Sequence, residues 1–449
     1  MFIDRLDPTP EGIAETAGVI AQLDNCFRSG FVGGQQQAAL AMLARIFAGT
    51  PLASRLAESV AALGRGEFQE AHFVSLAAAR AALQGAQYDT LRGHARAALG
   101  RAFDQDGIAQ VAPPAPLPLL DSARHWLMEL AISGFARLEA GALLPFLTTL
   151  AQLREQPGLL HVSALLTGFA GELLAALPIA QPDQVPLLRW CDLWSAAMLG
   201  AAGAAAPPLA RAVTGTLYPL GVELREHPQM LSVVFYGVLV ADGAAEFVRQ
   251  TWSRFKVAAI CGDESWLLFP DAAPLLESLV QGKALDVQNA RLLPTGDLIW
   301  DGSAARPGKK YKLLEIAARY FAPQAAEEAI VRPLPPLERH PVQIAEPVAL
   351  AGCTLLGERI RTSDGAEIAL DMRRSSGAEL TPEALAEASA LFGLLRYDAG
   401  EWALQPLAAG APGAKAIFAG QNGAKLFKKP PKSSAVAILE ERAGRLLRG

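Results

Sequence analysis

The chain has 449 residues, of which 51% are hydrophobic and 19% charged, and its formal net charge is −5. This composition is typical of a globular protein and excludes a disordered one, while the length predicts several domains. Residues 1–206 contain 13 arginines, no lysine and 18 acidic residues, and residues 207–449 contain 27 basic and 27 acidic residues. Neither part has the basic excess that is typical of a nucleic-acid-binding domain.

Cysteine usage and the N-terminus favour a cytoplasmic protein. The four cysteines are far apart and form no CxxC pair, which predicts reduced thiols and no zinc site. The first residues lack the basic and apolar segments of a secretory signal. The uncharged run 193–210 is rich in Ala and Gly and is interrupted by Pro207-Pro208, so we expect a buried helix there and no membrane partner. Thirty arginines against ten lysines, with abundant Ala and Gly, indicate a GC-rich and therefore bacterial gene.

The first half of the chain is predicted to be helical. Apolar residues such as Leu40, Leu43 and Phe47 recur at helical spacing within a predicted helical domain at 1–111. Closely spaced prolines at 112–118 predict a linker, because proline removes backbone donors and clashes with the preceding turn. Residues 119–206 form a second helical domain, either separate from the first or continuous with it.

Two segments of this half resemble each other. Pro118 precedes Trp126 by eight residues, and Pro186 precedes Trp194 by the same interval, with the two copies 68 residues apart. Twice 34 is a period that helical-hairpin repeats use, and Pro at the first helical position would give two equivalent helices. The alternative is coincidence in a background rich in Leu and Ala.

Residues 212–330 are predicted to form a mixed α/β domain. Segments 216–222 and 230–236 are rich in β-branched and aromatic residues, which favours strands, and Asp242-Gly243 favours a turn. Apolar residues between Phe247 and Phe255 fall at helical spacing and predict a helix. The other predicted elements are strands at 257–260 and 266–269 and helices at 271–281 and 309–321.

Prolines between 333 and 347 predict a second linker, and residues 345–449 a small α+β module with a Lys-rich tail. A hairpin is expected around Asp364-Gly365 and another around Asp398-Ala399-Gly400. Thr381 followed by Pro382 indicates a helix start, and the helix is expected to reach about residue 395. A short amphipathic helix is predicted at 436–447.

No motif assigns a catalytic residue. The six histidines are isolated, with none paired at i, i+4, so no metal site is predicted. The segment from Gly302 to Lys310 has five residues between its glycines where a phosphate loop has four, so no cofactor is predicted. The acids Asp263-Glu264, Asp297 and Asp301 follow predicted strands, where they could serve catalysis or occupy ordinary turns.

The stretch 402–439 contains five lysines, interleaved aromatic residues and no acid. Such a segment can bind an acidic protein surface or a nucleic acid, or it can act only as a solubilising spacer. The candidate interaction residues are Lys415, Lys425, Phe427, Lys428, Lys429 and Lys432.

These features favour a non-enzymatic scaffold or adaptor subunit that assembles with other protein subunits in the cytoplasm. One alternative is an enzyme or ligand-binding protein with a site in residues 212–325. Another is a subunit of a nucleic-acid-associated complex that uses the Lys-rich C-terminal tail. The fold class that we expect is α-rich and multidomain, with a helical N-terminal half followed by the α/β domain and the small α+β module.

Overall fold

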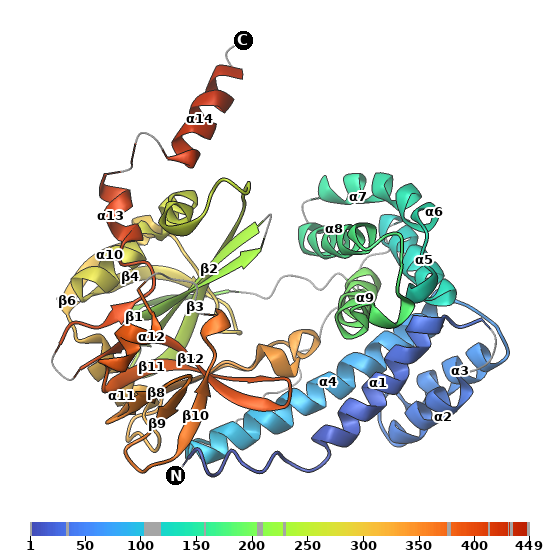
Figure 1. The fold of residues 1–449 in the computed structure, drawn as a ribbon, viewed down its shortest axis with the longest axis horizontal. Coiled ribbons are helices and arrows are strands. Elements are labelled where there is room, and N and C mark those ends of the chain that lie inside the picture. Colours follow the sequence, from blue (N-terminus) through green and yellow to red (C-terminus); the bar gives the residue numbers. More distant parts are fainter. Residues whose placement is uncertain are drawn as a thin grey trace.

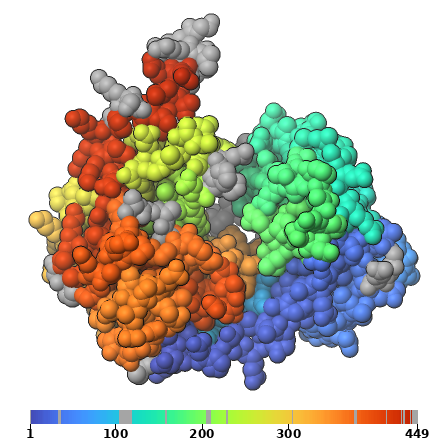
Figure 2. Space-filling model, viewed as in Figure 1, coloured from blue at the N-terminus to red at the C-terminus, as the bar shows by residue number. Residues whose placement is uncertain are grey.

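The computed structural model describes ten segments of the chain, which are residues 2–32, 36–102, 118–156, 159–203, 210–227, 230–374, 379–411, 414–429, 431 and 434–446. A helical N-terminal half is followed by a strand-rich C-terminal half, as the sequence predicts, and the two lie side by side (Figures 1 and 2). Within the described segments, no helix is long and apolar enough to cross a membrane.

The first half is built from helices of very different lengths. They are α1 (Ile13–Ser29), α2 (Gln37–Ile46), α3 (Ala53–Gly64), α4 (Glu70–Ala98), α5 (Pro118–Ser133), α6 (Ala140–Leu143), α7 (Leu147–Arg154), α8 (Leu160–Ala175) and α9 (Leu187–Ala202). A single-turn helix, η2 (Leu144–Phe146), joins α6 to α7. The longest, α4, has 29 residues and runs from the helical half into the strand-rich half (Figure 1).

Two sheets form the second half. The first has the strand order β3-β2-β1-β4-β5, with β6 on β4, and all its pairs are antiparallel. Its strands are β1 (Arg211–His227), β2 (Met230–Ala241), β3 (Ala244–Phe255), β4 (Lys283–Leu292), β5 (Leu298–Ile299) and β6 (Ala305–Lys310). The second sheet has the order β7-β11-β12-β10-β9-β8, with β13 on β12 and a parallel pair between β10 and β12. Its strands are β7 (Glu346–Ala351), β8 (Thr354–Leu356), β9 (Arg359–Arg361), β10 (Glu367–Leu370), β11 (Ala390–Asp398), β12 (Glu401–Gly410) and β13 (Ile417–Phe418).

Helices fill the spaces around these sheets. They are the 3₁₀ helix η5 (Gly262–Leu268) and the α-helices α10 (Ala273–Gln281), α11 (Leu313–Phe321), α12 (Pro382–Ala386), α13 (Gly423–Lys428) and α14 (Ala435–Leu446).

The two sheets meet where β1 crosses β12. A Cβ on Gly221 would lie 2.8 Å from the Cβ of Leu407, so only glycine permits this close approach.

Two hydrophobic cores organise the chain, and α4 takes part in both. Phe73 and Leu76 lie in the core of the helical half. Leu91 lies in the other core, which packs both sheets together with N-terminal residues such as Phe2 and Leu6. The predicted boundaries at 1–111, 119–206, 212–330 and 345–449 stay a prediction, but the shared core shows that the two sheets are not packed independently.

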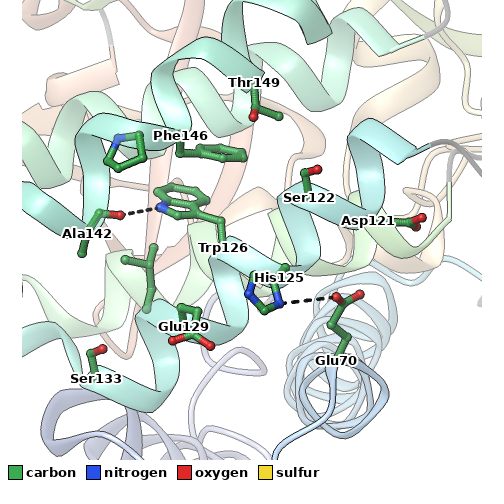
Figure 3. Close-up of a pocket in the computed structure, with 12 residues that line it drawn as sticks. Glu70, Asp121, Ser122, His125, Trp126, Glu129, Ser133, Ala142, Phe146 and Thr149 are labelled. Carbon is green, nitrogen blue, oxygen red and sulfur yellow. Dashed lines mark hydrogen bonds and ion pairs between the residues drawn. The ribbon is translucent and has the colours of Figure 1, made fainter.

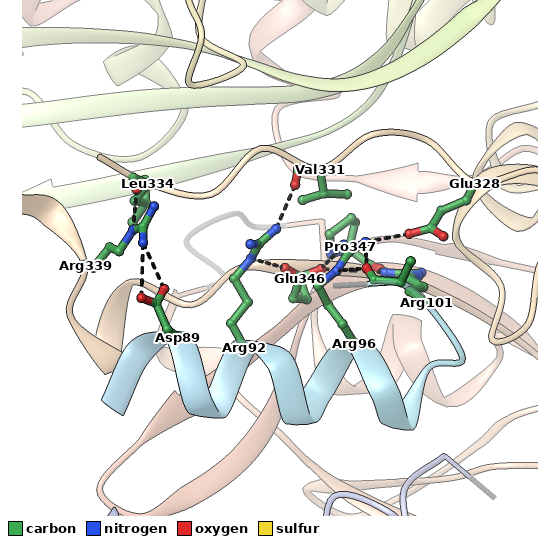
Figure 4. A network of polar contacts seen from close by, with 11 residues as sticks. Asp89, Arg92, Arg96, Arg101, Glu328, Val331, Leu334, Arg339, Glu346 and Pro347 are labelled. Atoms are coloured by element: carbon green, nitrogen blue, oxygen red, sulfur yellow. Dashed lines mark hydrogen bonds and ion pairs between the residues drawn. The ribbon is translucent and has the colours of Figure 1, made fainter. Parts of the chain in front are cut away.

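A buried polar network fixes the second half of α4 to the sheets (Figure 4). The carboxylate of Glu346, at the start of β7, is 2% exposed and lies 2.7 Å from Arg92 Nε, 3.4 Å from Arg96 Nη1 and 3.8 Å from Arg101 Nη1. Arg96 also lies 2.7 Å from the carboxylate of Glu328. Three buried guanidinium groups therefore converge on one buried carboxylate, and the helical half is joined to the sheets through α4.

The predicted helix at 247–255 is wrong. This segment is part of strand β3, which pairs with β2 over its whole length, from Ala241–Ala244 to Met230–Phe255. The turn prediction is confirmed, because Asp242 and Gly243 have φ values of 51° and 78°, which suit a two-residue hairpin loop. A tight turn after a long strand brings the next segment into register with that strand, and the ladder of backbone hydrogen bonds prevails over helical spacing.

Other boundaries also differ from the predictions. Residues 258–259 form a turn and Trp266 lies in η5, so neither 257–260 nor 266–269 forms a strand. The helix predicted from 309 begins at Leu313, because the preceding residues form β6. The helix capped by the Thr381 hydroxyl ends at Ala386, and the residues expected to continue it form β11. Both predicted hairpins and the C-terminal helix are confirmed, and the helix predicted at 271–281 is present as α10 from Ala273.

The Pro-rich segment 333–347 is packed against the helical half. The Arg339 guanidinium lies 3.1 Å from the Asp89 carboxylate, and His340 Nε2 lies 3.5 Å from Asp192 Oδ2. Burial would raise the pKa of Asp192, but the His340 and Arg80 side chains lower it to about 2. Ile344 is fully buried in the core of the sheets, while the pairs with Asp89 and Asp192 reach the helical half, so this segment is part of the contact between the halves. The linker predicted at 112–118 lies outside the described residues apart from Pro118, which begins α5.

The two predicted equivalent helices pack against each other. Helix α5 begins at Pro118 and α9 directly after Pro186, and Trp126 and Trp194 are both buried. Trp194 Nε1 donates a hydrogen bond to the Leu127 carbonyl at 2.8 Å. A 34-residue repeat stays a prediction.

Candidate functional site

A groove of about 650 Å³ lies on the exposed side of α5, between α5, the η2–α7 segment and the start of α4 (Figure 3). Helix α5 creates it because its apolar positions face the core. The polar residues Ser122, His125, Glu129 and Ser133 follow at intervals of three or four on the outer face. Trp126 lies at the boundary between the two faces and forms the floor.

The floor is a pair of stacked aromatic rings. The rings of Trp126 and Phe146 have centroids 4.1 Å apart and planes 9° apart. Trp126 Nε1 donates to the Ala142 carbonyl at 3.0 Å, which fixes the ring in place. On the same η2–α7 segment, Leu144 is 54% exposed and Leu147 is 40% exposed, although neither lines the groove.

The rim is acidic. Arg124 Nε donates to Glu70 Oε2 at 3.0 Å and Nη2 donates to Asp121, so one guanidinium orients two rim carboxylates. Arg124 also donates to the Ala201 carbonyl at 2.7 Å. His125 Nδ1 lies 3.8 Å from Glu70 Oε1. Glu129 is exposed and has no ion-pair partner within the described part of the chain. Three carboxylates, Glu70, Asp121 and Glu129, therefore face one arginine at the rim.

The Lys-rich segment folds onto the second half of the chain. Helix α13 packs on η5 and α10, and a Cβ on Gly420 or Gly423 would come within 2.5 Å of the Trp266 ring. The Glu379 carboxylate accepts backbone hydrogen bonds from Gly420 at 3.1 Å and from Asn422 at 2.8 Å. Small residues and these backbone contacts therefore hold the segment against the tryptophan.

The structure brings several of the predicted interaction residues onto one short helix. Lys425, Lys428 and Lys429 are exposed on or directly after α13, and Phe427 is half-buried against the core. Lys415 is exposed before β13, and Lys432 lies outside the described residues. Lys425 Nζ donates to Asn422 Oδ1 at 3.0 Å. We call Lys425, Lys428 and Lys429 the basic surface.

Three of the four carboxylates singled out in the α/β region, Glu264, Asp297 and Asp301, have structural partners. Glu264 accepts a hydrogen bond from the Ala435 amide at 2.9 Å, at the start of α14. Asp297 pairs with Arg249, and Asp301 accepts from the Ser303 amide at 2.9 Å. A cavity lined by residues of β1, β2, β3 and α10 has about 10 Å³, room for one water molecule. These three acids lie in caps and ion pairs, and the arrangement favours the turn interpretation of their positions.

Metal ligation finds no support in the described segments, where no three or more His, Cys, Asp or Glu side chains gather around a position for an ion. The segment 302–310, considered as a phosphate loop, forms a short 3₁₀ turn and strand β6 on β4. Its backbone groups are therefore engaged in a sheet.

Sequence reasoning missed the groove, although it singled out Trp126. The residues around it come from α4, α5 and the η2–α7 segment, and their polar members are spread over 80 positions from Glu70 to Thr149. The one available signal was the polar stripe on α5. Comparison of this chain with known protein families, with curated proteins and with solved structures finds no match.

Proposed function

We propose that the chain is a non-enzymatic scaffold or adaptor subunit of a protein assembly, and that the groove on α5 binds a helix of a partner. The observation that carries this proposal is the combination of an open groove, whose floor is formed by Trp126 and Phe146 at 7% and 5% exposure, with an acidic rim on a helical surface. An open groove of this kind suits recognition of a helix, whose apolar face covers the floor while its polar face stays in water.

The dimensions favour a helical occupant of about three turns. The stretch of α5 that lines the groove runs from Asp121 to Ser133, about 18 Å at 1.5 Å per residue. Apolar residues at i, i+3 and i+7 of a bound helix would cover Trp126 and Phe146 along this length. The acidic rim favours Arg or Lys beside that apolar stripe, because the unpaired charge of Glu129 would gain a partner.

Filling the groove should abolish partner binding without affecting the fold. Ser122 lines the groove and is exposed, so Ser122→Trp places a large ring in it at little cost to stability. Ser54, exposed in the first turn of α3, provides the matched control Ser54→Trp. Each tagged protein would be captured from the cells that encode it, and the bound proteins quantified by mass spectrometry.

We expect wild type and Ser54→Trp to retain the same proteins, and Ser122→Trp to lose at least one of them more than tenfold. Equal retention by all three proteins would contradict a contact at the groove. Unchanged thermal melting of both variants serves as the check on folding.

The basic surface is proposed as a second contact. Its lysines are exposed and repel one another, so an acidic partner surface would relieve that repulsion. Changing Lys425, Lys428, Lys429 and Lys432 to Gln should alter the free energy of unfolding by no more than about 0.5 kcal/mol. Partner capture should weaken, most strongly at low salt, where screening is least. Equal capture by both proteins across salt concentrations would show that the segment acts only as a solubilising spacer.

A further inference from the structure

The outer edge of strand β3 is only partly covered. Strand β3 lies at one end of the first sheet and pairs with β2 over its whole length. On its other side, isolated pairings with Ile330 and Asp297 cover the edge as far as Arg249. Within the described parts of the chain, no strand pairs with this side beyond that residue. The stretch from Thr251 to Phe255 is therefore an open edge.

Backbone groups along the open edge point outward. The amides of Phe247 and Arg249 donate away from β2, to carbonyls outside the sheet. The register between β2 and β3 runs without a break, and strand groups alternate in direction, so the amides and carbonyls of Thr251, Ser253 and Phe255 face the same way. Two of these carbonyls accept hydrogen bonds only from side chains of neighbouring residues. Such a row of groups is a template for another strand.

The side chains of the open edge also favour pairing. Thr, Trp and Phe are residue types that suit strands. Phe255 is 80% exposed, and Met230, its partner on β2, is 40% exposed. The open edge has a single charged residue, Arg254, whose guanidinium lies 3.5 Å from the Asp271 carboxylate. Strand β6 of the same sheet instead carries a proline, an arginine and two lysines, which are devices that discourage pairing at an edge.

The neighbourhood of Thr251 restricts what can pair with the open edge. The Trp300 amide donates to Gln250 Oε1 at 2.9 Å, so the adjoining part of the edge is already occupied. An antiparallel partner strand must therefore end where it meets Thr251. Strand β3 of a second copy meets this condition, because Phe255 is its last residue and the chain then leaves the sheet.

We propose that the protein forms a symmetric dimer in which the open edges of two copies pair antiparallel about a two-fold axis at Ser253. Thr251 of each copy then faces Phe255 of the other, and these pairs, with the central pair of serines, exchange two backbone hydrogen bonds each. On one face of the sheet Arg254 lies beside Trp252 of the other copy, a cation–π arrangement. A contact between identical surfaces closes as a dimer. The open edge is separate from the groove and the basic surface, so this proposal does not rest on the function proposed above.

Proline at position 253 tests the edge. Because the Ser253 amide points away from β2, Ser253→Pro removes an outward donor and leaves the hydrogen bonds between β2 and β3 in place. The matched control is Ser253→Ala. Both variants lose the hydroxyl that lies 2.7 Å from Ser232 Oγ, so they differ in the backbone donor. Masses of the full-length proteins would be measured by sedimentation velocity between roughly 1 and roughly 100 μM, a range that spans micromolar Kd values.

Wild type and Ser253→Ala should change from monomer to dimer as the concentration rises, without larger species. Ser253→Pro should dimerise roughly tenfold or more weakly, because the central pair loses both of its hydrogen bonds and the two rings clash. Thermal melting close to that of Ser253→Ala would show that the fold is intact. A wild-type protein that stays monomeric at the highest concentration would overturn the proposal, and so would a Ser253→Pro dimer as tight as that of wild type.

Cysteine crosslinking tests the position of the axis and does not depend on the proline variant. It uses a Cys261→Ser background, because Cys261 is exposed and the other three cysteines are buried. Across the proposed axis, the Cα atoms of the two Ser253 residues would lie about 5.5 Å apart, within reach of a disulfide. Those of the two Thr251 residues would lie about 14 Å apart, which is too far.

Mild oxidation should therefore link Ser253→Cys into a dimer roughly tenfold or more faster than Thr251→Cys. A mixture of Thr251→Cys and Phe255→Cys should form the mixed disulfide. Equal rates for Ser253→Cys and Thr251→Cys would indicate random collision and contradict the two-fold axis. The groove variant Ser122→Trp should dimerise like wild type, so a failure of this proposal can be distinguished from a failure of the function proposed above.

Discussion

Replacing Glu346 with Gln should lower the free energy of unfolding by about 3–5 kcal/mol, because it leaves buried charges without their counter-charge. The Glu346 side chain is 2% exposed, and those of Arg92, Arg96 and Arg101 are 4%, 5% and 4% exposed (Figure 4). Glutamine keeps the shape of the side chain but removes its charge. Chemical denaturation monitored by tryptophan fluorescence would measure the loss.

The matched control is Glu327→Gln, which removes one partner of a surface pair. Glu327 and Arg319 are 52% and 54% exposed, so the loss there should be at most about 1 kcal/mol. Combining Glu346→Gln with Arg92→Gln should cost less than the sum of the two single changes, because one unpaired charge is removed with its partner. A loss for Glu346→Gln no larger than that of the control would contradict the importance of the network.

This network matters for the proposed function because of where it lies. The first half of α4 belongs to the core of the helical half, and Glu70 at its start contributes to the groove. Its second half is joined to β7 through Glu346. Helix α4, together with the segment 333–347, thus joins the half that carries the groove to the strand-rich half that carries the basic surface.

Local sequence patterns correctly predicted the turns and the helix start that depend on contacts between neighbouring residues. The turns at Asp242-Gly243 and Ala399-Gly400 carry positive φ values, which suit Asp and Gly but not the alanine, and both hairpins form. Thr381 caps the helix that begins at Pro382. In each case the contacts that determine the element join residues only a few positions apart, so a local sequence pattern is enough to predict it.

Where the prediction of an element was wrong, contacts with residues distant in the sequence determined its secondary structure. Phe247 and Phe255 fall at helical spacing, but twelve pairs with β2 place them in a strand. The helix at Thr381 stops early because the residues after it pair with both β7 and β12. The groove escaped prediction for a related reason. The sequence singled out Trp126 only for its spacing from Pro118, and the fold places Phe146 and Glu70 beside it.

Truncating Trp194 to Ala should be the most costly change within the helical half, with a loss of about 3–5 kcal/mol in the free energy of unfolding. The side chain is fully buried, and its ring centroid lies 4.3 Å from that of Phe27 and 6.5 Å from that of Phe73. Truncation would leave a large cavity between α1, α4 and α9 and would leave the Leu127 carbonyl without its indole donor. Both effects act in the same direction.

Two further variants separate these effects. Trp194→Phe keeps most of the apolar volume and removes only the hydrogen bond, so we expect a smaller loss of about 1–3 kcal/mol. Trp126→Ala should be less costly than Trp194→Ala, because Trp126 is 7% exposed and faces the open groove, where water can enter the space left by the ring. Urea denaturation of the three variants would give the order of stability. Equal losses for Trp126→Ala and Trp194→Ala would indicate that the groove floor is as enclosed as the core, and the space above Trp126 would then be too small to receive a helix.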